Sequence, residues 1–156
     1  MSGERITHIS FDDPALVARN PDLDHERRVA IFDLLENNFF KLNTGDEGPY
    51  RVILSLADRA LQLSVRTAQD DHICDIKLSL TPFRRLIKDY FLICESYYEA
   101  IRTATPQHIE TIDMARRALH NEGSELLKER LNEFANVDLE TARRLFTLVS
   151  VLQMRG

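Results

Sequence analysis

Cysteine is scarce in this chain of 156 residues, which contains only two and no CxxC pair. Cys74 in HICDI and Cys94 in LICES lie in apolar contexts that indicate ordinary strand and helix positions rather than reactive ones. A reducing compartment is therefore the simpler expectation. A chain of this length also buries enough surface to fold without disulfides or a metal, so we expect no cofactor.

Targeting and membrane segments are also lacking. The first fifteen residues have neither the basic start nor the apolar stretch of a secretory signal. No apolar run approaches the roughly 18 residues that a membrane span requires. We therefore expect a cytoplasmic protein that does not enter a membrane.

Positive charge is not in excess, since the net charge is −5 and the isoelectric point is near 5.5. A mildly acidic surface repels phosphate backbones, which disfavours nucleic acid as a partner. Among the basic residues, sixteen arginines stand against four lysines. Arginine suits forked recognition of carboxylate or phosphate, although the coding bias of a GC-rich genome explains the excess more simply.

The short motifs of well-known enzyme classes are missing. The sequence has no GxGxxG, no GxxxxGK[ST], no GxSxG, no HExxH and no zinc-type cysteine pairing. Its five histidines are spaced so that no two share a helical face as a chelating pair. A metal site is therefore not expected, and the recognisable catalytic classes are excluded.

Periodicity in the first half of the chain predicts one helix and four strands. Arg5–Phe11 is a short, partly β-branched edge strand, and Asn20-Pro21 opens a helix that should end near Phe40. After the turn-rich 43–49, the period changes to two. Three alternating segments then predict an antiparallel meander of strands with one polar and one buried face. They are YRVILSLA, the residues that follow Asp58-Arg59, and HICDIKLSL.

The second half predicts three helices. Thr81-Pro82 and Thr105-Pro106 are matching helix starts, and Asp138 caps a last helix that is apolar nearly all round. Gly123-Ser124 favours a kink or break over a close helix crossing in the helix at 107–134. The broad apolar stripe of the helix after Thr81 should pack on the sheet; it comprises Phe83, Leu86, Ile87, Tyr90, Cys94, Tyr97 and Ile101.

Together these patterns predict one α+β domain over residues 1–156. We expect a three- or four-stranded antiparallel meander with one face covered by about four helices, in the order β-α-β-β-β-α-α-α. The last helix should be a core or interface element.

Titratable residues appear at inward positions of the predicted helices. Asp113, Arg116 and His120 fall within the apolar stripe of the third helix, where unpaired charges are costly. On the first helix, His25 and Glu36 flank Val29 and Phe32 on what the pattern indicates is the inward side. Salt bridges between helices, which fix the packing register, are the favoured explanation.

A functional explanation of these residues is a polar pocket between the second and third helices. Its candidate lining residues are Glu95, Tyr98, Arg102, Asp113, Arg116 and His120. His120, oriented by Asp113 or a glutamate, would then move a proton near neutral pH, while arginines hold an anionic ligand. Ser124 lies one turn away, but its neighbours indicate a helix cap rather than a nucleophile.

An Arg-Arg pair occurs once in each predicted helix, at 27-28, 84-85, 116-117 and 143-144. Neighbouring helical residues point about 100° apart, so one member of each pair can turn inward. The inward members are expected to be Arg28, Arg84, Arg116 and Arg143. Convergence of these arginines would make an anion site, but arginines more often lay their stems over apolar surface and keep their charged ends in water.

Four stretches carry a resemblance to a known family: NPDLDHER, GPYR, LTPFRRLIKDYFLICESYYEAIRTATPQHIETIDMARRALHNEGSE and TARRLFTLVSVL. With them the chain resembles, over almost its whole length, Uncharacterised Protein Family 0262 of alphaproteobacteria. The resemblance implies a bacterial cytosolic protein that consists of this one domain. It brings no activity, cofactor or partner with it.

Two functional hypotheses remain. The first is a non-catalytic binding or regulatory protein that acts through a protein partner or as a homo-oligomer, based on the apolar last helix and on Leu92, which projects from a polar helix face. The second is an enzyme or sensor for a small anionic molecule. A strictly monomeric protein whose last helix is fully covered within its own fold would remove the main support for the first hypothesis.

Overall fold

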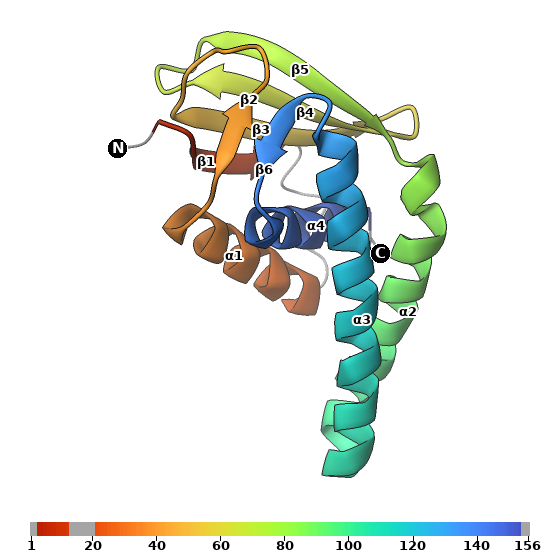
Figure 1. The fold of residues 1–156 in the computed structure, drawn as a ribbon. Coiled ribbons are helices and arrows are strands. Elements are labelled where there is room, and N and C mark those ends of the chain that lie inside the picture. Colours follow the sequence, from red (N-terminus) through yellow and green to blue (C-terminus); the bar gives the residue numbers. More distant parts are fainter. Residues whose placement is uncertain (1–2, 13–20, 154–156) are drawn as a thin grey trace.

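The computed structural model describes residues 3–12 and 21–153, and it has α+β architecture as predicted (Figure 1). The elements in chain order are β1 (Ile6–Phe11), α1 (Pro21–Glu36), β2 (Phe40–Leu42), β3 (Tyr50–Ala57), β4 (Ala60–Thr67), β5 (His72–Ser79), a 3-10 turn (Thr81–Phe83), α2 (Arg84–Thr103), α3 (Pro106–Leu131), β6 (Ala135–Val137) and α4 (Leu139–Gln153). The proposed cap at Asn20 lies outside the described residues, but α1 begins at Pro21 as expected.

The main sheet has four strands in the order β1-β3-β4-β5. β3, β4 and β5 form the predicted antiparallel meander, and β1 occupies the predicted edge. The expectation of a wholly antiparallel sheet is wrong, because β1 pairs with β3 in parallel. The chain leaves β1, passes through α1 and returns, and such a crossover connection aligns the two strands in the same direction.

The first helix ends at Glu36, four residues before the predicted end. There the side-chain amide of Asn38, in place of a backbone N–H, binds a carbonyl oxygen of the last helical turn. Asn38 Nδ2 donates to the Leu34 carbonyl oxygen at 2.8 Å. The same amide accepts from Ile6 N at 2.7 Å and donates to Ile6 O at 2.9 Å. The chain then enters β2, which pairs with β6 in a small antiparallel sheet that the sequence pattern did not predict.

Helix α4 lies beneath the main sheet, with α1 beside it (Figure 1). Nine of its residues are buried: Thr141, Ala142, Leu145, Phe146, Leu148, Val149, Ser150, Val151 and Leu152. The predicted Asp138 cap is confirmed, since Thr141 N donates to Asp138 Oδ1 at 2.9 Å. The last helix is thus a core element and leaves no broad apolar face open.

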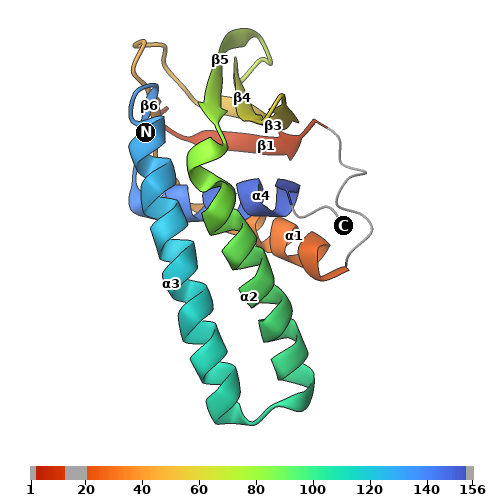
Figure 2. The ribbon, with the colours of Figure 1, turned by 90° about the vertical axis from the view of Figure 1, so that its right-hand side faces the viewer.

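Helices α2 and α3 form a hairpin that projects beyond the rest of the molecule (Figure 2). α2 therefore packs along α3 rather than on the sheet, and Ile101, expected to face inward, is 51% exposed near the tip. Leu92 is 50% exposed, as expected. The Thr105 cap is confirmed by a bond from His108 N at 3.3 Å, whereas Thr81 lies in the 3-10 turn and caps no helix.

Helix α3 is continuous, so the predicted kink at Gly123-Ser124 is wrong and the alternative, a close helix crossing, is what the structure contains. A Cβ atom at Gly123 would lie 2.2 Å from Cζ of Phe146 on α4. Ser124 is buried and donates to the His120 carbonyl oxygen at 2.7 Å, so it is a mid-helix residue and not the predicted cap.

We expect Gly123→Ala to lower the free energy of unfolding by about 1–2 kcal/mol. Alanine favours a helix over glycine by about 1 kcal/mol, but overpacking against the Phe146 ring costs about 1–3 kcal/mol or more. Urea denaturation measures the difference. Ala115→Gly, at an exposed position of α3, is the control and should cost about 1 kcal/mol through helix propensity alone. A Gly123→Ala protein as stable as the wild type would contradict the close contact.

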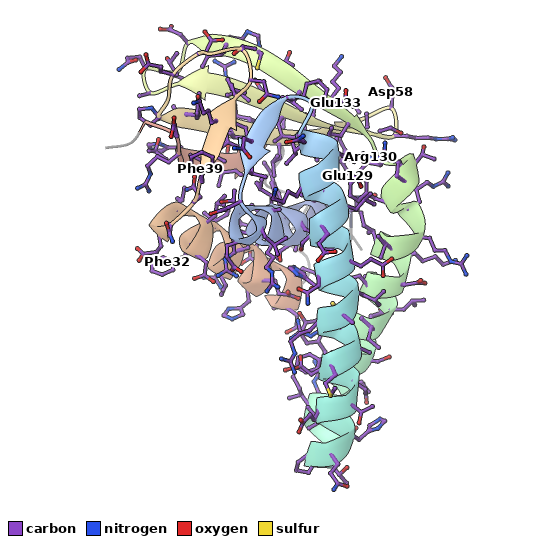
Figure 3. The ribbon with its side chains drawn as sticks, viewed as in Figure 1. Phe32, Phe39, Asp58, Glu129, Arg130 and Glu133 are labelled. Carbon is purple, nitrogen blue, oxygen red and sulfur yellow. The ribbon has the colours of Figure 1, made fainter. Side chains whose placement is uncertain are left out.

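The β3–β4 turn places two residues other than glycine in the left-handed region, Asp58 with φ 50° and Arg59 with φ 63°. Asp58 is labelled at this turn in Figure 3. Two-residue hairpin turns with positive φ at both positions favour Asn-Gly or Asp-Gly, because a Cβ atom is crowded there. The turn therefore carries backbone strain at Arg59.

We expect Arg59→Gly to raise the free energy of unfolding by up to about 1 kcal/mol, because glycine removes that crowding. Chemical denaturation compared with wild type measures it. Arg85→Gly at an exposed, helical position of α2 should instead lower stability by about 1 kcal/mol. Equal losses in both variants would show that the turn is unstrained.

Candidate functional site

A cavity of about 350 Å³ lies where all four helices meet. It is lined by Glu26 of α1, Tyr90 of α2, Arg116, Arg117, His120 and Asn121 of α3, and Arg143, Arg144 and Thr147 of α4. The volume is within the usual range for a small-molecule site, about 300–1,000 Å³. Four guanidinium groups in one hollow are its main chemical feature.

The arginine pair on α3 shares one carboxylate. Asp113 Oδ1 receives Arg116 Nη2 at 2.7 Å, and Asp113 Oδ2 lies 3.1 Å from Arg117 Nε. The guanidinium of Arg116 also stacks 4.4 Å from the ring centre of Tyr97 on α2. Burial lowers the pKa of Arg116, but its bond to Asp113 and the surrounding groups raise it, and the net shift is upward. Arg116 therefore stays charged and fixed in place.

The pair on α4 also shares one carboxylate, with looser geometry. Arg143 Nε lies 3.6 Å from Glu140 Oε2, and Arg144 Nη2 lies 3.8 Å from Glu140 Oε1. Glu140 is 61% exposed, so solvent weakens both ion pairs. Arg143 Nε is buried and makes no hydrogen bond within the part of the chain that the structure describes. This leaves a buried donor at the cavity without a hydrogen-bond acceptor.

Positive charge exceeds negative charge around the cavity. Two arginine pairs share Asp113 and Glu140, and Glu26 is the third carboxylate. Four guanidinium groups thus face three carboxylates, which leaves one uncompensated positive charge. In a partly buried site this charge attracts an anion more strongly than it would on an open surface.

His120 is held as a neutral hydrogen-bonding group. Its ring lies 5.5 Å from that of Tyr90 and 5.3 Å from that of Phe146, and its Nε2 lies 2.7 Å from Thr147 Oγ1. Because the Thr147 hydroxyl donates to the Arg143 carbonyl oxygen at 3.3 Å, His120 Nε2–H is assigned as the donor to Thr147.

The pKa of His120 is lowered from 6.5 to about 4, first by burial and then by the charges of Arg116, Arg143 and Arg144. The imidazole is therefore neutral at pH 7. Asp113 does not orient it, because both carboxylate oxygens of Asp113 bind arginines. His120 thus lacks the near-neutral pKa that the proton-transfer hypothesis requires.

Glu26 enters the cavity from α1 with Tyr98 behind it. The Tyr98 hydroxyl donates to Glu26 Oε2, and burial followed by this bond raises the pKa of Tyr98. The inward face of α1 that was predicted from the sequence is wrong. The buried residues of this helix are Leu23, Ala30 and Leu34. Val29 and Phe32, expected to face inward, are 43% and 65% exposed, and Figure 3 shows Phe32 at the outer side of the helix.

The six candidate site residues are only partly brought together. Arg116 and His120 line the cavity, and Asp113 and Tyr98 hold cavity residues in place. Arg102 is 61% exposed and lies 3.7 Å from Asp22, outside the cavity. Glu95 borders a different groove, of about 570 Å³, along α2 and α3. The polar hollow is thus enclosed by α1 and α4 as well as by the two predicted helices.

Two of the four expected inward arginines converge. Arg116 and Arg143 line the cavity, joined by their neighbours Arg117 and Arg144. Arg28 instead pairs with Asp24 at 3.2 Å and is 65% exposed, and Arg84 is exposed on α2. The other lining residues that sequence reasoning did not assign to a site are Glu26, Tyr90, Asn121 and Thr147.

Other reactive features are limited in the described residues. Burial raises the pKa of the Cys94 thiol to about 12, so the thiolate is not populated near neutral pH. Within residues 3–12 and 21–153, no group of three or more His, Cys, Asp or Glu is placed to hold a metal ion. No described helix combines the length and apolar character needed to cross a bilayer.

The lowered pKa of His120 makes the stability of the fold depend on pH. Between pH 6.5 and about 4 the unfolded chain binds a proton at His120 that the folded chain excludes, so stability falls as the pH falls through this window. Between pH 7 and pH 4.5 we expect the wild type to lose about 2 kcal/mol from this group, and His120→Gln, which keeps a donor near Thr147, to lack that part of the decline. Urea denaturation at pH 7 and pH 4.5 measures it.

The control for this prediction is His108→Gln, because His108 is exposed near the start of α3. Its pH profile should match that of the wild type. If His120→Gln loses as much stability on acidification as the wild type, the lowered pKa is not responsible.

The family model and the relatives that match this chain all belong to one protein family. The model of an uncharacterised protein family, UPF0262, matches residues 3–155. UPF0262 proteins of Ruegeria pomeroyi and Agrobacterium fabrum are 51% and 55% identical to the chain, over 100% and 97% of its length and 100% and 96% of theirs. One from Rhodospirillum rubrum is 52% identical over 98% of the chain and 94% of its own length. No solved structure matches the chain. The resemblance expected from the sequence is thus confirmed, and the chain belongs to the UPF0262 family.

Proposed function

We propose that this protein binds a small anionic molecule in the four-helix cavity, and that it acts as a binding or sensing protein of the bacterial cytosol. The observation that carries the proposal is the convergence of two Arg-Arg pairs, each sharing a single carboxylate, on one hollow of about 350 Å³. Arginine forks recognise carboxylate and phosphate groups in this way.

The hydrogen-bonding groups of the cavity support anion binding. Arg143 Nε is buried without an acceptor, and the amide of Asn121 adds an uncharged donor to the lining. An anion that enters would accept these bonds and compensate the surplus positive charge. Hydrogen bonds to charged groups contribute about 1.5–3 kcal/mol each, so each such bond to the anion would strengthen binding about tenfold or more.

A binding role is favoured over catalysis because the groups around the cavity are not set up for bond breaking. His120 is neutral with a pKa of about 4, and Ser124 is fully buried and bonded to the helix backbone. Neither can serve as an activated base and nucleophile near pH 7.

Self-association through the last helix loses its main support, because α4 is covered within the fold. The remaining exposed large apolar side chains are spread over three helices: Val29, Phe32, Leu92, Ile101 and Met114. Single exposed apolar side chains are common on the surfaces of monomeric proteins and do not by themselves indicate an interface. Anion binding is therefore the better-supported hypothesis.

We expect inorganic phosphate and short carboxylates to raise the melting temperature of the wild type, because a ligand that binds only the folded state stabilises it. Arg143→Met keeps the aliphatic stem but removes the charge and the unpaired donor. It should weaken phosphate binding about tenfold or more, as measured by calorimetry at low ionic strength.

The matched control is Arg84→Met, which also changes one member of an Arg-Arg pair but at an exposed position outside the cavity. It should bind phosphate as the wild type does. Equal weakening in both variants would indicate a general charge effect, and no anion binding by the wild type would overturn the proposal.

A further inference from the structure

A second hollow, of about 190 Å³, adjoins the arginine cavity between α1 and α4. Glu26, Arg144 and Thr147 line both hollows, so these three side chains form the boundary between them. We call the second hollow the α1 groove; beyond the boundary it is lined by His25, Val29, Ala30 and Asp33. A ligand that is seated on the arginines and reaches past this shared wall would extend along α1.

The charge balance reverses between the two hollows. The arginine cavity is lined by four guanidinium groups and one carboxylate, that of Glu26, while Asp113 and Glu140 bind the arginines from outside the lining. The α1 groove contains two carboxylates, Glu26 and Asp33, against the single guanidinium of Arg144. Of the two adjoining hollows, one is therefore lined mainly by cationic groups and the other by acidic groups.

Asp33 is a carboxylate without an ion-pair partner among the described residues. It is partly buried in the groove wall, and it makes no hydrogen bond or ion pair with any residue in 3–12 or 21–153. Its carboxylate oxygens remain in contact with solvent, so a cationic group of a ligand can bind them in place of water. A ligand that carries a positive charge or an N–H donor would supply what Asp33 lacks.

Geometry limits where such a donor would lie. Asp33 follows Glu26 by seven residues, which corresponds to about two helical turns, or roughly 10 Å along α1. A short amino acid on the arginines would place its amine near Glu26, whereas a longer chain would reach the Asp33 carboxylate.

From these observations we infer that the ligand of the arginine cavity is a dipolar organic molecule, with an anionic group held by Arg116 and Arg143 and a terminal amine bound by Asp33. This inference rests on the proposed anion-binding function and adds the second recognition point. The Val29 and Ala30 side chains contact the linking carbons, so a plain inorganic anion fills only one end of the site.

The test compares two probes that differ in one group, hexanoate and 6-aminohexanoate, by calorimetry at pH 7 and low ionic strength. The wild type should bind 6-aminohexanoate about tenfold more tightly, since one additional charge-assisted bond corresponds to about 1.4 kcal/mol. Asp33→Asn, which keeps the shape of the side chain, should abolish this preference and leave hexanoate binding unchanged. Glu36→Gln is the matched control, an exposed carboxylate of the same helix that lines neither hollow, and should keep the preference.

The outcomes distinguish a failure of amine binding by Asp33 from a failure of anion binding by the arginine cavity. If hexanoate and phosphate bind and 6-aminohexanoate binds no better, the dipolar ligand is wrong while anion binding stands. The same holds if Asp33→Asn retains the preference for the amine. If neither probe nor phosphate binds the wild type, the anion site itself is wrong and the inference is overturned with it.

Discussion

The contact between Gly123 of α3 and the ring of Phe146 on α4 is the constraint on which the site depends. With no side chain at Gly123, the two helices approach until the ring meets the backbone, and a Cβ atom there would lie 2.2 Å from it. The same ring then supports His120, at 5.3 Å between centroids. His120 in turn reaches Thr147 on α4 at 2.7 Å. One missing methyl group thus sets the distance between the two helices that supply the arginines.

The electrostatics of the site follow from this close approach. Once the helices meet, burial first and then the charges of Arg116 and Arg143 hold the pKa of His120 at about 4. A neutral imidazole does not add to the repulsion among the guanidinium groups. Each arginine pair is also restrained by one shared carboxylate, which limits the repulsion without cancelling it. The protein therefore maintains a positive field inside a folded domain.

Sequence reasoning found the elements with long periodic patterns and missed those that depend on distant contacts. The β3–β5 meander, the starts of α1, α3 and α4, and the edge position of β1 were predicted from period, caps and prolines. The short strands β2 and β6 were missed because three residues carry no period. The inward positions of Arg116 and Arg143 were predicted from helical geometry. Their convergence was not, since it depends on which helices cross. Glu26 was missed because α1 has only weak amphipathicity and its inward face was misassigned.

A purely structural role explains the arginine cavity poorly. Protein interiors are normally close-packed, and a buried ion-pair network can often be replaced by apolar side chains with no loss of stability. Here the junction of four helices leaves a hollow of about 350 Å³ that is partly open to solvent. The carboxylate shared by Arg143 and Arg144 is 61% exposed, so its ion pairs are weak, and Arg143 Nε has no acceptor. An ion-pair network that served packing alone is expected to satisfy this donor, and the proposed anion would supply the acceptor that Arg143 Nε lacks.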